Sequence, residues 1–404
     1  MKAKILMITP YLPYHSQAGG QTRSFYLIKH LSKNNLITLV CFTRDKTGLS
    51  ELKKYCQKVV IVKRGKTWDL KKILRTGFSL NPFLISNYLD KTLKQKIRQE
   101  LDSQKYDLIH SECFYLMPNI PKSKTPVILV DQTIEYAVYQ HFVESLKGWK
   151  SLLKPLLWID VLKLKFWETY YWKHTHTVTA VSQEDRQLMS KLSGRSDIQL
   201  INNGVSQTFF KTKKGGAKTK YPSILFGVSN MKWMQNKEAV FLLLKDIWPK
   251  IKQAIPSAKL FIIGRHSPQV FKNYQSSDII IKEADQKGLK HDPQYYYQKS
   301  WILLAPIKSG GGSRTKFFEA MASRLAIVTT KQGIEGIAAK NQVEAVVSPY
   351  QKLASASIKL LKNKQKRKQI GQSAHQLCLK QYSWSKSAQS LNQLYQKIIK
   401  SNEK

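Results

Sequence analysis

Two short apolar segments enclose a glycine-rich loop and a helix in the second half of the chain. Residues 301–306 and 325–330 have the composition of buried strands. Between them lies SGGGSRTKFFEAMA, residues 309–322. A helix that starts directly after such a loop points its free N–H groups and the positive end of its dipole at the loop. This part of the chain is therefore constrained to a strand–loop–helix–strand unit that favours an anion at the helix start.

The loop and the first helical turn carry residue types suited to a nucleoside diphosphate. Arg314 and Lys316 place positive charge where it opposes the helix dipole unless an anion offsets it. Glu319 can stay ionised one turn further on and accept hydrogen bonds from a ribose diol. A surface loop followed by an ordinary capped helix is the alternative. The ligand-binding residues predicted here are Gly310, Gly311, Gly312, Ser313 and Glu319.

The order of apolar segments predicts an α/β fold with two doubly wound parallel sheets. Strand and helix patterns alternate throughout, and a strand–loop–helix pattern starts twice, near residues 4 and 223. A chain of 404 residues is too long for one core and suits two domains. Residues 211–220 (KTKKGGAKTK) read as the linker. We therefore expect two Rossmann-like domains, 1–210 and 211–380, that face each other across a cleft.

The charge of the chain limits its partners without selecting one. Lys and Arg number 67 against 26 Asp and Glu, a formal net charge of +41. Such a field attracts nucleic acids, anionic lipid surfaces and phosphorylated substrates. The four cysteines are scattered, which indicates neither a zinc site nor a disulfide framework and fits a reducing compartment. The first ten residues resemble a strand more than a signal peptide, and no uncharged segment is long enough to span a membrane.

Residues 146–173 combine aromatic and basic side chains. Trp149, Trp158, Trp167 and Trp172 occur among six lysines, with apolar residues on all sides of the predicted helix. One interpretation is a long helix packed on the sheet. The other is contact with a membrane surface, since lysine stems beside indole rings suit a headgroup interface.

At this point the sequence resembles the GT-B glycosyltransferases of family 4 (glycosyl transferases group 1) over nearly its whole length. The resemblance is strongest in GGGSRTKFFEAMA and in IVTTKQGIEG, at 327–336. NNGV at 202–205 and YSW at 382–384 resemble further family motifs. The resemblance implies a GT-B fold in which a C-terminal helix, 381–404, packs back on the N-terminal domain. It also implies transfer of a sugar from a nucleotide diphosphate donor with retention of anomeric configuration.

The resemblance also assigns roles in the C-terminal, donor-binding domain. Glu319 matches the second glutamate of the family's E-x7-E pattern, expected to hold the ribose. The first glutamate is replaced by Gly311, so backbone amides would read the donor sugar instead. Arg314 and Lys316, with Arg265, would neutralise the diphosphate leaving group. The donor is a substrate, and no cofactor or bound metal is implied.

In the N-terminal, acceptor-binding domain the resemblance draws attention to two glycines and two polar residues. Gly19 and Gly20 would approach the phosphates, with an ordinary turn as the alternative. His110 is expected just after a strand as a catalytic residue, and Glu112 competes for that role. A structural histidine is the alternative for His110.

Asp131 and Glu135 follow the next strand. They could orient the acceptor, and Asp131 could instead cap a helix.

The expected function is a cytoplasmic, metal-independent glycosyltransferase of surface-polysaccharide or glycolipid assembly. Its acceptor would be a glycan or a lipid-linked molecule, and it would attach peripherally to the inner face of the cell membrane. Asp-x-Asp, P-loop and G-x-G-x-x-G motifs are absent from the sequence. The alternatives are a basic nucleic-acid-binding protein, although no specific nucleic acid is expected, and a catalytically inactive GT-B scaffold motivated by Gly311.

Overall fold

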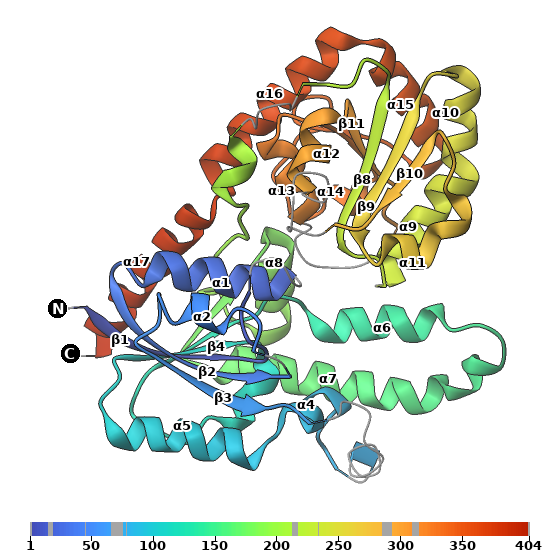
Figure 1. The fold of residues 1–404 in the computed structure, drawn as a ribbon. Helices are drawn as coiled ribbons and strands as arrows, with labels where there is room; N and C mark the ends of the chain where they lie inside the picture. The colour runs from blue at the N-terminus through green and yellow to red at the C-terminus, as the bar shows by residue number, and fades with distance from the viewer. Residues whose placement is uncertain are drawn as a thin grey trace. The chain divides into compact units, whose positions relative to one another are not determined.

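The structure, a computed structural model, describes residues 2–14, 19–44, 46–65, 76–77, 79–211, 217–232, 234–284, 293–308 and 315–402. The chain divides into two compact units. The first comprises Met1–His15, Gly20–Asn202 and Ser387–Lys404, and the second comprises Ser16–Gly19 and Asn203–Lys386. Figure 1 shows that each unit is built on its own sheet, with helices on both faces.

The first unit contains a parallel sheet in the order β3-β2-β1-β4-β5-β6-β7. Its strands are β1 Ala3–Thr9, β2 Asn35–Thr43, β3 Lys58–Lys63, β4 Leu108–Glu112, β5 Val127–Val130, β6 Thr177–Ala180 and β7 Gln199–Leu200. The α-helices are α1 Gly19–Leu31, α2 Leu49–Leu52, α4 Phe83–Tyr88, α5 Lys91–Ser103, α6 Glu135–Ser145, α7 Lys154–His174, α8 Gln183–Ser193 and α17 Trp384–Asn402. The 3₁₀ turns η1 Phe114–Asn119 and η2 Gly148–Leu153 precede β5 and α7.

The second unit contains a parallel sheet in the order β10-β9-β8-β11-β12-β13. Its strands are β8 Ser223–Asn230, β9 Lys259–Arg265, β10 Ile279–Lys282, β11 Ile302–Ala305, β12 Ala326–Thr329 and β13 Val346–Val347. The α-helices are α9 Met234–Leu242, α10 Trp248–Ala254, α11 Ser267–Phe271, α12 Pro293–Lys299, α13 Thr315–Ala322, α14 Lys331–Ile334, α15 Leu353–Lys362 and α16 Lys364–Gln381. Short η turns are η3 Gln207–Phe210, the π-turn η4 Leu243–Ile247, η5 Lys272–Tyr274 and η6 Tyr350–Lys352.

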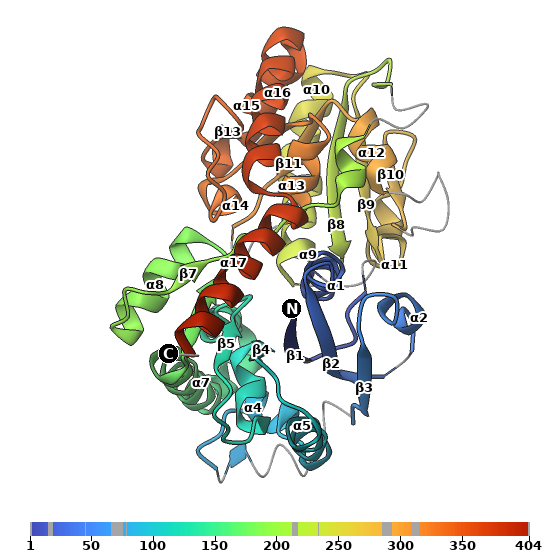
Figure 2. The ribbon, with the colours of Figure 1, turned by 90° about the vertical axis from the view of Figure 1, so that its left-hand side faces the viewer.

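Side chains of the first sheet alternate between two hydrophobic clusters. Ile5 and Met7 point into a cluster with α1 and α17, while Leu6 and Ile8 point into one with α4, α5 and α7. A strand covered on both faces needs apolar residues at every position, which explains the continuous apolar segment in β1. The C-terminal helix α17, red in Figure 2, contributes Leu391 to the α1 side. The two doubly wound sheets and the returning C-terminal helix are confirmed.

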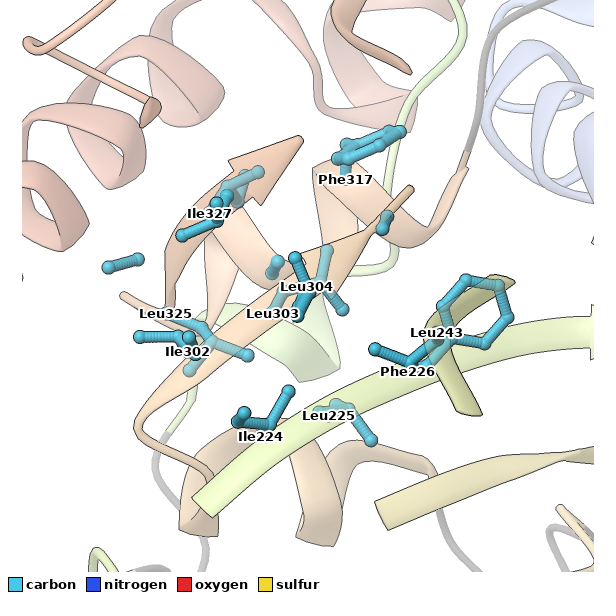
Figure 3. Packing of buried hydrophobic residues seen from close by; sticks show 14 of the residues in the cluster. Ile224, Leu225, Phe226, Leu243, Ile302, Leu303, Leu304, Phe317, Leu325 and Ile327 are labelled. Carbon is cyan, nitrogen blue, oxygen red and sulfur yellow. The ribbon is translucent and has the colours of Figure 1, made fainter. Parts of the chain in front are cut away.

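The core of the second unit fixes the helix that carries the predicted donor residues. Figure 3 shows Leu303 and Leu304 of β11 between the side chains of β8 and Ile327 of β12. Phe317 and Phe318, in the first turn of α13, are at most 1% exposed and belong to the same cluster. Burial of a phenylalanine side chain stabilises the fold by about 1.5–3 kcal/mol. The residues on either side of this pair, Lys316 and Glu319, are therefore held in a fixed orientation.

Candidate active site

The helix α13 starts at the point where a doubly wound sheet usually binds its ligand. In the second sheet the chain runs outward from β8 to one edge and then from β11 to the other edge. Side chains at the carboxyl ends of β8 and β11 therefore lie beside the point where strand order reverses. The helix that follows β11 begins at Thr315. Its N-terminus adds the positive end of a helix dipole to this edge.

Lys316 is the charged group that the structure places at this edge. Its side chain is buried, with 7% exposure, and its Nζ lies 3.3 Å from Oδ1 of Asn236 in α9. Asn236 is held in turn, because its Nδ2 donates to the carbonyl of Asn230 over 2.7 Å. The Lys316 ammonium also lies 5.2 Å from the ring centroid of Phe226 in β8. These contacts hold the ammonium as a fixed positive charge at this edge, which suits an anionic ligand.

Glu319 lies one turn further along α13, against the hydroxyl of Tyr297 in α12. Burial, and then the neighbouring Glu319 carboxylate, raise the pKa of Tyr297 well above its usual range. Gly227 in β8 makes room for this hydroxyl, since a Cβ at that position would lie 2.8 Å from it. The carboxylate is half-buried and able to accept hydrogen bonds from hydroxyl groups of a ligand.

The predicted loop residues Gly310, Gly311, Gly312, Ser313 and Arg314 lie outside the described residues, so their roles stay predictions. Arg265 ends β9, the strand beside β8, and thus belongs to the same edge of the sheet. Its carbonyl accepts from the N–H of Met231 over 2.9 Å. The assignment of its guanidinium to the diphosphate also remains a prediction.

His110 and Glu112 form a buried network in the first unit. Both residues lie within β4 and are fully buried, which corrects the expectation that His110 follows the strand. The His110 Nε2 lies 3.1 Å from Oε1 of Glu112, and its Nδ1 contacts the hydroxyl of Tyr395 in α17. A carboxylate only accepts hydrogen bonds, so Nε2 donates to Glu112, and in the neutral imidazole Nδ1 then accepts from the tyrosine. Both ring nitrogens therefore have partners within the first unit.

The other Glu112 oxygen connects this network to the start of α1. Gln132 donates its Nε2 to Glu112 Oε2 and to the Tyr11 hydroxyl, the latter over 3.0 Å. Gly20 is required for this arrangement, because a Cβ there would lie 2.5 Å from the Tyr11 hydroxyl and 2.7 Å from Gln132 Oε1. Gly19 begins α1, and a Cβ there would contact nothing within 4 Å. Their predicted contact with phosphate remains a prediction.

A buried arginine accompanies the Glu112 carboxylate. Arg23 of α1 is 1% exposed, and its guanidinium donates to the carbonyls of Ile201 and Asn202 over 3.3 and 3.4 Å. Burial lowers the pKa of Arg23, and Glu112 raises it, which places the two charges within electrostatic range of one another. The network thus contains opposite charges that stabilise each other away from solvent.

Asp131 and Glu135 belong to a second acidic cluster, beyond β5. Asp131 accepts from Trp172 Nε1 over 2.7 Å. It does not cap α6, because the Glu168 carboxylate accepts the N–H groups of Glu135 and Tyr136 over 2.8 and 3.0 Å. Burial raises the pKa of Asp131 to about 7 and that of Glu135 to about 8. Asp131 is therefore not the cap of α6, its carboxylate instead accepts the N–H of Phe114 at the start of η1, and its role toward an acceptor stays a prediction.

Several site residues came from parts of the chain that sequence patterns did not connect. In the second unit, Asn236 and Tyr297 contact Lys316 and Glu319 from other helices. In the first unit, Arg23 and Gln132 join the Glu112 network from a helix and a loop. Tyr395 of α17 contacts His110 through its hydroxyl, and no sequence pattern connected these two residues. One sequence feature could have indicated the approach of Tyr297. Gly227 is a glycine inside an apolar strand, which indicates that another group lies close to the backbone there.

The described residues offer neither a metal-binding cluster nor a helix that could span a membrane. Within the ranges that the structure covers, no three His, Cys, Asp or Glu side chains are placed to share a metal ion. No helix in these ranges combines the length and apolar character needed to cross a bilayer.

Two family models match the chain, one on each unit. Residues 18–209 match Glycosyltransferase Family 4, and residues 222–363 match Glycosyl transferases group 1. A search of curated protein sequences gave no match.

Many solved structures are similar to the chain. Sucrose-phosphate synthase from Thermosynechococcus elongatus is 14% identical, covering 99% of this chain and 100% of its own, with a TM-score of 0.72. HepE from Anabaena, in complex with UDP and glucose, is 12% identical, covering 98% and 100%, with a TM-score of 0.66. WaaG, a glycosyltransferase involved in lipopolysaccharide biosynthesis, is 11% identical, covering 97% and 99%, with a TM-score of 0.65. These likenesses establish the fold, and with the two family matches they show that the chain belongs to the group 1 glycosyltransferases of the GT-B fold.

Proposed function

We propose that this glycosyltransferase moves a sugar, with retention of configuration, from a nucleoside diphosphate to a glycan or lipid-linked acceptor in surface-polysaccharide or glycolipid assembly. The observation that carries the donor assignment is the pair Lys316 and Glu319 on α13, at the carboxyl ends of β8 and β11. The nucleic-acid-binding and inactive-scaffold alternatives are not favoured by the family matches.

The proposed chemistry follows from what these two side chains can do. Negative charge grows on the diphosphate as the bond to the sugar breaks, and a preorganised cation lowers the free energy of that transition state. Lys316 supplies such a cation, because Asn236 and Phe226 already hold it in place. Glu319 would accept hydrogen bonds from the ribose hydroxyls, which fixes the leaving group.

The acceptor class is inferred from the charge of the chain and from a protein that shares its fold. The net charge of +41 suits an acceptor that carries phosphate groups, such as a lipid-linked diphosphate. WaaG, which shares the fold, is described as a lipopolysaccharide enzyme. The same charge supports peripheral attachment to the inner face of the cell membrane. Retention rests on the family resemblance, and NMR assignment of the anomeric configuration of the product tests it.

Calorimetry tests the donor assignment after a thermal-shift screen with UDP-, GDP-, ADP- and dTDP-sugars has selected the nucleotide. Lys316→Ala and Glu319→Ala should each weaken donor binding by about 1.5–3 kcal/mol, the contribution of a hydrogen bond to a charged group. Lys316→Ala should also lower kcat by about 10²–10³, as loss of one transition-state donor does.

Lys364→Ala, an exposed lysine at the start of α16, is the matched control and should bind the donor like the wild type. Donor affinity that is unchanged in both site variants would contradict the assignment. Normal binding with no detectable transfer to any acceptor would support the inactive scaffold.

A further inference from the structure

The helix α7 has apolar side chains on two opposite sides, and the described residues of the first unit cover only one of them. Val161, Leu164 and Trp172 are buried, at 3%, 0% and 0% exposure, and Leu164 and Trp172 pack into the core below the sheet. The opposite side carries Leu156, Ile159, Leu162, Phe166 and Tyr170, which are 40–65% exposed. A helix that is apolar all round is normally buried all round.

These five exposed residues form one continuous stripe, which we call the outer face of α7. At 3.6 residues per turn they fall within about 120° of the helix circumference. Neighbours three and four positions apart touch along a helix surface, and the Phe166 and Tyr170 rings stack with centroids 6.4 Å apart. Single exposed apolar residues are ordinary, but a continuous stripe of this kind marks an interaction surface.

The turn before α7 extends this apolar surface. In η2, Trp149, Leu152 and Leu153 are 74%, 82% and 47% exposed. Figure 1 shows α6 and α7 side by side as a hairpin, with this turn at its far end. The tip of the hairpin thus presents large apolar side chains to solvent.

The charged side chains around this surface are mostly basic. Lys147, Lys150 and Lys173 are exposed beside it. The acidic residues of α7 are engaged elsewhere, since Asp160 accepts from the N–H of Phe83 over 2.8 Å and Glu168 is fully buried. On α6, Glu144 is exposed and contacts Gln140 over 2.9 Å. Apolar side chains flanked by lysines match the two layers of an anionic bilayer interface, acyl chains below and acidic headgroups above.

We propose that the outer face of α7, together with η2, is the surface by which this protein docks on an anionic lipid bilayer. A second copy of the chain is a poorer occupant, because a symmetric contact would bring two lysine-rimmed faces of a +41 protein together. This inference rests on the proposed function, because it identifies the surface through which the enzyme would attach to the membrane. Its test measures vesicle binding, so it can fail while sugar transfer stands, and the reverse also holds.

Flotation with phosphatidylcholine vesicles, with and without phosphatidylglycerol, tests the apolar part. The wild type should float with the phosphatidylglycerol vesicles at low salt, and less as salt increases. The triple variant Leu156→Gln/Leu162→Gln/Phe166→Gln should partition at least about tenfold more weakly, since loss of two buried methylene groups already gives that factor. The matched control Val343→Gln/Leu379→Gln removes similarly exposed side chains from the second unit and should float like the wild type.

A second pair of variants tests the charged part. Lys147→Gln/Lys150→Gln should lower binding to phosphatidylglycerol vesicles about thirtyfold, and Lys364→Gln/Lys368→Gln, on α16, should have little effect. All substituted residues are exposed, so circular dichroism and donor-induced thermal shifts should match the wild type. Absence of flotation at low salt would overturn the proposal. An equal loss of vesicle binding in a variant and its control would also overturn it. A wild-type dimer that becomes a monomer in the triple variant, without vesicle binding, would assign the outer face to a second copy.

Discussion

Gly227→Ala tests how the second unit positions Glu319. The added Cβ would lie 2.8 Å from the hydroxyl oxygen of Tyr297 and 3.1 Å from its Cζ. Tyr297 is only 1% exposed and packs edge-on against Phe209, with ring centroids 5.7 Å apart, so it has little room to move. Overpacking of this kind costs about 1–3 kcal/mol. Alanine recovers about 0.4–1 kcal/mol by restricting the unfolded chain, which leaves a net loss with a midpoint of about 1.3 kcal/mol and an upper bound of about 2.6 kcal/mol.

The measurement combines thermal unfolding with donor titration. A unit of about 180 residues should lose about 2–4 °C of Tm per kcal/mol, so a decrease of a few degrees is expected. Donor affinity should fall as well, because the displaced hydroxyl lies against the Glu319 carboxylate. Gly65→Ala is the control, since its Cβ would meet nothing within 4 Å.

A double-mutant cycle isolates the contact between position 227 and the hydroxyl of Tyr297. Tyr297→Phe removes the atom closest to the new Cβ, so the two substitutions together should cost at least about 0.5 kcal/mol less than their sum. If Gly227→Ala kept the Tm and the donor affinity of the wild type, the described packing of Tyr297 between β8 and Glu319 would be wrong.

Two further predictions concern the first unit. Tyr395→Phe leaves the buried Nδ1 of His110 without its donor, so calorimetry or chemical denaturation should show a loss of about 1–3 kcal/mol; wild-type stability would contradict the contact. Asp131 has its pKa raised by burial to about 7, above the unfolded value, so the folded state retains a proton that the unfolded state has lost. This contribution to stability is present at acidic pH and is lost as pH rises through 7, by up to about 1.4 kcal/mol per pH unit. Asp131→Asn should flatten the wild-type pH dependence of the unfolding free energy between about pH 4 and pH 7 in denaturant titrations, and parallel profiles would refute the shift.

Much of the fold could be predicted because a doubly wound sheet leaves a strong local pattern. Strands covered on both faces have continuous apolar segments, as residues 5–8 of β1 and all of β11 show. The segment 146–173 was harder, because apolar residues surround the helix and periodicity alone does not distinguish a packed side from an exposed one. Only the burial of Leu164 and the exposure of Phe166 separate the two sides of α7.

The site was predictable only where its residues share one helix. Lys316 and Glu319 are three positions apart on α13, so their spacing already places them on one side of a helix. Their contacts come from α9 and α12, and no periodic signal links Asn236 or Tyr297 to α13 across such separations. His110 was misplaced relative to its strand because strand ends are poorly marked when the strand is followed by more buried residues, as β4 is followed by η1.

In each unit a glycine makes room for a tyrosine hydroxyl that leads to a carboxylate. In the first, the absence of a side chain at Gly20 admits the Tyr11 hydroxyl, which connects through Gln132 to the Glu112 carboxylate. In the second, Gly227 admits the Tyr297 hydroxyl, which lies against the Glu319 carboxylate.

A buried carboxylate needs fixed polar neighbours, and a tyrosine reaches it with a rigid ring that loses little conformational entropy on ordering. That ring fills the space beside the backbone, so glycine is favoured at the position that the hydroxyl approaches. A glycine beside a buried strand of a doubly wound sheet is therefore informative even without a phosphate-binding pattern, because it indicates where a polar side chain from another element enters the site.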